Sequence, residues 1–238
     1  MEDLRIVAPT QFGRACLEAL LTALEGVARP VVGLPTGNTP VGLYEALQTA
    51  VRERRADVSD WVLVAIDEYG GPREHPCSNR AFFARYWDTI PGAPPVEQFD
   101  PEAPDIAAEC RRMDDSVVRA GGLDVALLGI GMNGHLAFNE PGSTPASQTR
   151  RVDLHESSIL SGAHCWGEEA PHWGVTLGLD RLLAARTVLV MANGEAKAAI
   201  VAAALRGPRT SDCPASFVRD AARPVWVLDE AAARLLRG

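Results

Sequence analysis

Short runs of apolar residues recur along this chain and alternate with longer segments that have helical periodicity. The runs, rich in Val, Ile and Leu, lie at 4–9, 29–35, 60–67, 123–131, 187–194 and 224–230. Uninterrupted apolar runs of this length are typical of parallel strands covered on both faces, because a strand with one solvent-exposed face alternates apolar and polar residues instead. The pattern predicts an α/β fold with three layers: a mostly parallel, Rossmann-like sheet with helices on both faces.

The segments between the runs have apolar residues spaced three and four apart, as amphipathic helices require. Helices are predicted at 11–28, 39–56, 78–87, 104–121, 174–185, 195–206 and 229–237. Pro40 suits the first turn of the second helix, with Thr39 as its cap. The proline-rich stretch 90–105 is typical of a surface connection, and no repeat or linker composition divides the chain. We therefore expect a single domain over residues 1–238.

Composition and charge exclude several classes of partner. The chain has 238 residues, 47% of them hydrophobic, and a net charge of −8. An acidic protein lacks the basic face that nucleic-acid binding needs, although a few local donors can still hold an anionic metabolite. No run approaches the about twenty apolar residues of a membrane span, and residues 1–20 lack the pattern of a signal peptide. We expect no nucleic-acid or membrane partner and a cytoplasmic location.

The cysteines are odd in number, widely scattered and without a C-x-x-C pair. They are Cys16, Cys77, Cys110, Cys165 and Cys213. This usage favours reduced thiols in a cytoplasm over a disulfide scaffold or a zinc site.

Polar residues gather where predicted strands end, which is where open α/β sheets bind ligands. After the second strand, 33–40 combines small residues with a helix start, so that backbone N–H groups can face an anion. An ordinary turn is the alternative, since the glycine-lysine-serine ending of a P-loop is absent. Asp67 and Glu68 end the third strand and point opposite ways on an extended chain. One carboxylate can enter the crevice while the other braces the loop; turn or helix capping is the alternative.

The fourth strand is followed by GIGMNGHLAFNEP at 129–141. Its glycines let the backbone turn and approach a ligand, and His135 can move protons near neutral pH with Glu140 to orient it. A structural histidine is the alternative. After the fifth strand, Lys197 stands near a helix start, where a positive charge is favourable when an anion lies nearby. A solvated lysine is the alternative there, but four polar strand ends in one chain favour a shared site.

These segments resemble the glucosamine-6-phosphate deaminase (glucosamine-6-phosphate isomerase) family, which is related to the 6-phosphogluconolactonases. GLPTGNTPVGLYEAL resembles the family's phosphate loop, IDEYGG its Asp-Glu-Tyr motif, and GIGMNGHLAFNEP its Gly-His…Phe-Asn-Glu-Pro signature. VTLGLDRLLAARTVLVMANGEAKAAIV resembles the segment with its phosphate-contacting lysine. The lactonases share the Gly-His turn but continue differently, so Glu140 favours the deaminases.

The resemblance implies an enzyme without metal or organic cofactor that opens the ring of an amino sugar 6-phosphate, moves a proton between C2 and C1 and expels ammonia. Asp67 is implied as the base for that proton, and His135, with Glu140 and Asn133, as the acid–base group of ring opening. The implied substrate and phosphate contacts are Thr36, Gly37, Asn38, Thr39, Glu68, Gly134 and Lys197. The implied partner is a small-molecule sugar phosphate, with the chain a monomer or small homo-oligomer.

Two departures from the family pattern bear on the substrate. Asn133 stands where the best-known members have Asp; its oxygen can accept the imidazole N–H but brings no negative charge. The family's phosphate-gripping arginine is missing from 155–174, where the aligned position falls on or beside Ala163. His164 and Arg219 are the candidates to replace its charge.

Val152 occupies the aligned position of an activator-site lysine found in the longer, allosteric members, so no activation by N-acetylglucosamine 6-phosphate is expected. Three functions are compatible with the residues. The first is a deaminase of glucosamine 6-phosphate or of its galactosamine epimer. The second is a 6-phosphogluconolactonase, and the third is a weakened sugar-phosphate-binding regulator, which Asn133 and the missing arginine would favour.

Overall fold

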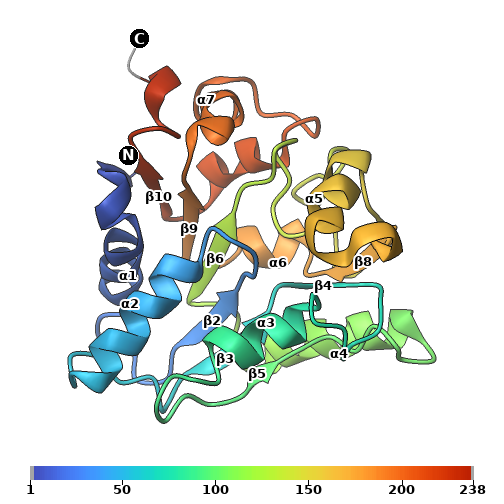
Figure 1. The fold of residues 1–238 in the computed structure, drawn as a ribbon, viewed down its shortest axis with the longest axis horizontal. Helices are drawn as coiled ribbons and strands as arrows, with labels where there is room; N and C mark the ends of the chain where they lie inside the picture. Colours follow the sequence, from blue (N-terminus) through green and yellow to red (C-terminus); the bar gives the residue numbers. More distant parts are fainter. Residues whose placement is uncertain (1–2, 237–238) are drawn as a thin grey trace.

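Seven parallel strands form the main sheet in the computed structural model, which describes residues 3–236. In spatial order they are β1 (Asp3–Val7), β10 (Pro224–Asp229), β9 (Thr187–Ala192), β6 (Val125–Gly129), β2 (Val31–Leu34), β3 (Val62–Ala65) and β5 (Val96–Glu97). Every neighbouring pair runs parallel. The three-layer α/β fold predicted from the apolar runs is confirmed, and Figure 1 shows helices on both sides of the sheet.

Helices cover the two faces in two groups. One face carries α1 (Phe12–Ala23), α2 (Val41–Arg52) and α3 (Asn79–Tyr86); the other carries α4 (Ile106–Arg119), α6 (Leu179–Leu183) and α7 (Ala198–Arg206). Successive residues of β6 alternate between the two cores: Val125 and Leu127 face the first group, and Ala126 and Leu128 face the second. All four are fully buried, which is why the strand has an uninterrupted apolar sequence.

A second, antiparallel sheet lies beside the first and was not predicted. It consists of β4 (Asp67–Tyr69), β8 (Trp173–Thr176) and β7 (Arg150–Asp153), in that order. The expected strand at 60–67 therefore divides, because Ile66 ends the run and Asp67 pairs with Thr176 in the small sheet. The expected helix at 174–185 is wrong in its first part for the same reason.

Helix α5 (Glu156–Trp166) packs beside the small sheet, as Figure 1 shows in yellow, in a segment for which no element was predicted. The expected helix at 229–237 is a short 3-10 turn at Arg234–Leu236, and residue 237 lies outside the described residues. The other 3-10 turns are at Pro9–Gln11, Gly167–Glu169, Glu195–Lys197 and Pro214–Asp220. Helix α2 begins at Val41 with Pro40 as its N-cap, so Thr39 is not the cap that was expected.

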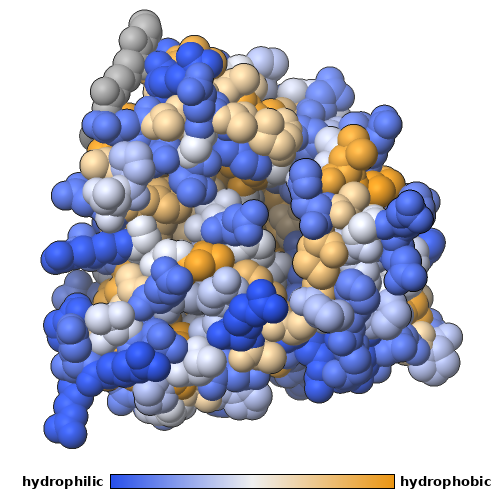
Figure 2. Space-filling model, viewed as in Figure 1, coloured by the Kyte–Doolittle hydropathy of each residue, from blue (hydrophilic) through white to orange (hydrophobic). Residues whose placement is uncertain are grey.

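The strand order reverses between β2 and β6. The chain proceeds from β2 to β3 on one side and from β6 to β9 on the other, so the loops after β2 and β6 diverge and leave a crevice at the carboxyl ends of the strands. The surface in Figure 2 is mostly hydrophilic, with apolar residues in separate small patches. Within residues 3–236, no helix has both the length and the apolar character needed to cross a membrane.

Candidate active site

A cavity of about 550 Å³ opens at the carboxyl ends of the parallel strands. Its lining includes 36–39 after β2, Asp67 after β3, His135 after β6 and Lys197 after β9. Helices α3 and α5 close the remaining sides. The volume lies within the range of small-molecule sites. The structure therefore brings together all four strand ends that the sequence singled out.

Asp67 is a buried carboxylate that reaches the cavity from the first position of β4. Asn79 donates its side-chain amide to Asp67 Oδ1 at 2.7 Å and to the Asp67 carbonyl at 2.9 Å. Burial and the charge of Glu68 raise the pKa of Asp67 to about 7, although the Asn79 hydrogen bond opposes that rise. A carboxylate with a pKa near the working pH is suited to act as a general base.

Glu68 points away from the cavity and does not line it. Its Oε1 accepts the backbone N–H groups of Tyr69 (2.8 Å) and Asn79 (2.9 Å), and its Oε2 accepts that of Arg80 (3.1 Å). Glu68 thus satisfies the first N–H groups of α3, where a negative charge also interacts favourably with the helix dipole. Of the two adjacent carboxylates, Asp67 enters the crevice and Glu68 braces the loop, so Glu68 makes no direct ligand contact in this arrangement.

His135 lines the cavity with its side chain about one-fifth exposed (21%). Its ring Nδ1 lies 3.2 Å from Glu140 Oε2 and 3.2 Å from Ser158 Oγ. Within the described residues, Nε2 has no hydrogen-bond partner and can meet a ligand. The ring packs over Gly131, where a Cβ would come within 2.4 Å of Nε2, so only glycine fits there.

Glu140 stands behind the imidazole rather than in the cavity. Burial raises its pKa, but the hydrogen bond and charge of His135 lower it more, and Ser158 and Asn133 add to this, leaving a pKa of about 2. The carboxylate therefore stays ionised at neutral pH. It can hold the imidazole in one orientation and stabilise a positive charge on the ring.

Asn133 has a different contact from the one expected. Its oxygen accepts the backbone N–H of His135 at 3.2 Å rather than the ring N–H, and its amide donates to Glu140 Oε2 at 2.7 Å. The reason is that Glu140 already occupies the ring nitrogen that Asn133 was expected to bind. Gly134 does not line the cavity; its positive φ of 85° allows the turn that carries His135.

The loop from Thr36 to Thr39 forms part of the cavity wall, with Gly37 at a positive φ of 88°. Lys197 donates from Nζ to the carbonyl of Ile130 at 2.7 Å, and burial lowers its pKa. The remaining Nζ protons can face an anion in the cavity. The Thr36 hydroxyl is not free to do so, because it donates to Asn79 Oδ1 at 2.7 Å.

The missing arginine is not replaced by Arg219. That side chain lies outside the cavity and donates to the carbonyls of Leu205, Gly207 and Ser216 at 2.7–3.3 Å. His164 does line the cavity, and so does Arg85 of α3, which the sequence analysis missed. Arg85 lies within a predicted helix, and only the fold shows that its side chain faces the site.

Two other residues of the site were also missed. Asn79 holds Asp67, and Ser158 holds His135, but both lie in helices whose sequence gives no sign of a ligand. The Ser78-Asn79 pair was a weak signal, since Ser78 is a typical N-cap and does accept the N–H of Ala81.

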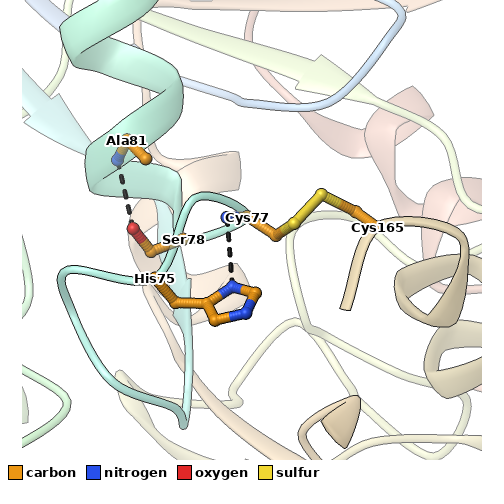
Figure 3. Close-up of a disulfide and its surroundings, with 5 residues drawn as sticks. All are labelled: His75, Cys77, Ser78, Ala81 and Cys165. Atoms are coloured by element: carbon orange, nitrogen blue, oxygen red, sulfur yellow. Dashed lines mark hydrogen bonds between the residues drawn. A yellow bond between two sulfur atoms is a disulfide. The ribbon is translucent and has the colours of Figure 1, made fainter. Parts of the chain in front are cut away.

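A disulfide ties two walls of the cavity together. Cys77, just before α3, is bonded to Cys165 of α5, with 5.8 Å between their Cα atoms and a sequence separation of 88 (Figure 3). Beside it, His75 stacks on Trp166 at 3.9 Å and accepts the N–H of Cys77. The expectation of five reduced thiols is therefore wrong for this pair. The fold, not the spacing, brings the two together, whereas Cys16, Cys110 and Cys213 are free and buried.

Comparison with known sequences gives one consistent family. Residues 8–226 match the family described as glucosamine-6-phosphate isomerases/6-phosphogluconolactonase. A glucosamine-6-phosphate deaminase of Streptomyces coelicolor is 37% identical over 233 residues, covering 94% of this chain and 88% of that protein. One of Rhodococcus opacus is 39% identical over 224 residues, covering 90% of this chain and 86% of that protein.

Solved structures share the fold over its whole length. A monomeric glucosamine-6-phosphate deaminase superimposes with a TM-score of 0.92 at 29% identity, covering 99% of this chain and 100% of that one. A 6-phosphogluconolactonase from Trypanosoma brucei has a TM-score of 0.75 at 22% identity, covering 99% of each chain. At 22% identity, the similarity to the lactonase shows only that the two proteins share a fold.

Proposed function

Because the chain belongs to the family of glucosamine-6-phosphate isomerases and 6-phosphogluconolactonases, we propose that it is an enzyme that converts glucosamine 6-phosphate and water to fructose 6-phosphate and ammonia. One observation carries the proposal. A buried carboxylate, Asp67, and an imidazole paired with a carboxylate, His135, line one cavity together with the loop 36–39 and a lysine. This set supplies the two kinds of proton transfer that the reaction needs.

The first proton transfer opens the sugar ring. The O1 hydroxyl loses a proton and the ring oxygen gains one as the bond between C1 and that oxygen breaks. His135 carries out both transfers through Nε2, because Glu140 and Ser158 occupy Nδ1. The ionised Glu140 stabilises the imidazolium that forms between the two transfers.

The second proton transfer moves the double bond. Asp67 takes the proton from C2 of the open-chain aldehyde while O1 gains a proton from the substrate's ammonium group, which gives an enolamine with a neutral amine. Asp67 then returns its proton to C1. The nitrogen at C2 is then an iminium, to which water adds before ammonia leaves and the ketone of fructose 6-phosphate remains. Burial helps here, since a carboxylate with a raised pKa is a stronger base than one in water.

The loop after β2 and Lys197 hold the phosphate in this proposal. Backbone N–H groups of 36–39 and the Nζ of Lys197 supply donors, as anion sites at helix starts commonly do. Arg85 and His164 are the further basic residues on the cavity wall that stand in for the absent arginine. The ligand is a small metabolite, with no nucleic-acid or membrane partner. We place the enzyme in the cytoplasm as a monomer or small homo-oligomer.

An assay of three substrates tests the function. Ammonia and fructose 6-phosphate are followed from glucosamine 6-phosphate and from galactosamine 6-phosphate, and acid release is followed from 6-phosphogluconolactone. The proposal predicts equal amounts of ammonia and fructose 6-phosphate from the first. Turnover of galactosamine 6-phosphate alone would move the assignment to the epimer, and acid release alone would make the chain a lactonase. Binding of a sugar phosphate without turnover of any of the three substrates would indicate a sugar-phosphate-binding regulator.

A further inference from the structure

Asn79 is fixed by hydrogen bonds at every donor of its side chain. Its amide gives one proton to Asp67 Oδ1 (2.7 Å) and the other to the Asp67 carbonyl (2.9 Å). Its side-chain oxygen accepts the Thr36 hydroxyl at 2.7 Å. The residue is buried, with 3% of its surface exposed. Exchanging the amide nitrogen and oxygen would set an oxygen against two oxygens of Asp67, so the chemistry fixes the orientation.

The contact leaves Asp67 with two unlike carboxylate oxygens. Oδ1 is held by Asn79, whereas Oδ2 has no hydrogen-bond partner within the described residues and belongs to the group that lines the cavity. A base that moves a proton between adjacent carbons must present one oxygen to both positions. Holding the other oxygen stops the carboxylate from rotating about its Cβ–Cγ bond, and misplacing a reacting group by about 1 Å can cost 100-fold in rate.

We propose that Asn79 is the positioning residue for the base Asp67, and that it links this base to the anion-binding loop through the hydroxyl of Thr36. This inference rests on the proposed function, because that function makes Asp67 the base. The new element is the role of Asn79. This residue lies on α3 and lines the cavity, but it acts by positioning Asp67. A phosphate that orders residues 36–39 therefore also orders the Thr36–Asn79 hydrogen bond, and through Asn79 it fixes the orientation of Asp67.

Other ionisable groups near Asp67 bear on the test. Glu68 and Tyr69 lie on the same strand, Tyr44 reaches it from α2, and His135 and Lys197 line the same cavity. None of them donates a hydrogen bond to Asp67 in the part of the chain that the structure describes. The Asn79 amide is therefore the contact whose removal raises the pKa of Asp67 most directly.

Asn79→Ala tests the proposal in two ways. With glucosamine 6-phosphate we expect kcat to fall about 10- to 100-fold while KM changes less than about threefold, because the carboxylate is misplaced but the phosphate is still held. The acid limb of kcat/KM should move to higher pH by about one unit, since a hydrogen bond that favours the charged form is lost. A merely structural role would lower the amount of folded protein without moving that limb.

The second readout does not depend on turnover. The carboxyl carbon of Asp67 is titrated by NMR in protein labelled at aspartate, and its resonance is assigned by its loss in Asp67→Asn. A higher midpoint in Asn79→Ala supports the proposal. An unchanged midpoint together with an unchanged kcat overturns it. If wild-type protein releases no ammonia from any amino sugar phosphate, the proposed function fails, and the NMR midpoint still decides on Asn79.

If Asn79→Ala does not fold, Thr36→Val and Thr36→Ser test the proposal instead. Thr36→Val removes the hydroxyl that fixes Asn79, and we expect at least threefold lower kcat than in Thr36→Ser, which keeps the hydroxyl. Equal kcat in this pair overturns the link to the anion loop. Arg80→Ala is the control on α3: its side chain is exposed, pairs with Glu74 at 3.4 Å and lies outside the cavity. Its activity should equal that of the wild type.

Discussion

Asn133 donates its side-chain amide to Glu140 Oε2 at 2.7 Å, on the same oxygen that faces the imidazole of His135. Asn133 thus supplies an uncharged donor to the ionised Glu140. A carboxylate there would bring a second negative charge into hydrogen-bond distance of the first. The departure from the family pattern at Asn133 therefore completes the pair of Glu140 and His135 in this chain.

Asn133→Asp should make folding depend on proton uptake. Two carboxylates at this distance repel unless a proton is shared by the pair or held on the imidazole, so the folded variant binds more protons than the unfolded chain. Its free energy of unfolding should fall below that of the wild type by roughly 1–3 kcal/mol at pH 8 and recover toward pH 5. Urea unfolding at both pH values measures this. A loss that is the same at pH 5 and pH 8 would count against the geometry.

Asp67→Asn should stabilise the protein at high pH. The pKa of Asp67 is raised to about 7 in the folded state from an ordinary value of 3.8, so its ionisation opposes folding as pH rises through that window. The variant should match the wild type near pH 4 and exceed it by about 1–4 kcal/mol above pH 7. Asp88→Asn, at an exposed site just after α3, is the control and should show no such difference. A wild type as stable as the variant at pH 8 would refute the buried charge.

Arg85→Ala should weaken binding of the phosphorylated sugar. Arg85 lines the cavity in a chain that lacks the family's arginine, and losing one charge-assisted contact to phosphate costs about 1.5–3 kcal/mol, or roughly 10- to 150-fold in KM. Arg80→Ala removes the same residue type from the same helix outside the cavity. Steady-state kinetics should show a raised KM in the first variant and wild-type values in the second. If both variants had the same KM, Arg85 would not contact the phosphate, and His164 would be the only candidate left to replace the missing arginine.

The disulfide should be visible as a difference in thiol count and in stability. Denatured, oxidised protein should react at three thiols with a disulfide reagent, and reduced protein at five. A disulfide that closes a loop of this length contributes about 2–5 kcal/mol, so Cys165→Ser should lower the free energy of unfolding by that amount. Cys77→Ser should give the same loss, and the double variant no more. Five reactive thiols in protein kept under air would contradict the Cys77–Cys165 bond.

The sequence could predict the parts of the site that depend on local patterns. Each strand is an apolar run, and the polar residues just after it reach the crevice because parallel strands end at one edge. Asp67, His135 and Lys197 were found in this way and all line the cavity. The roles assigned to them stay proposals until the reaction is measured.

The remaining parts depend on contacts between distant segments. Asp67 pairs with Thr176 in the small sheet, and no local pattern in 174–185 indicates that its first residues form a strand. Likewise, Cys77 meets Cys165 because the fold places α5 beside the loop before α3. Asn133 was located correctly but given the wrong partner. Glu140 lies behind the imidazole because the chain turns back between Leu136 and Asn139, with Ala137 at a positive φ of 51°.

The most direct test of the central claim is the fate of the C2 proton. Glucosamine 6-phosphate is incubated in D₂O with wild-type protein and with Asp67→Asn, and NMR follows deuterium at C1 of fructose 6-phosphate beside ammonia release. If Asp67 is the base, ammonia, fructose 6-phosphate and solvent deuterium at C1 appear with the wild type, and none of these appears above background with a folded Asp67→Asn. Wild-type rates of ammonia release and exchange in that variant would contradict it.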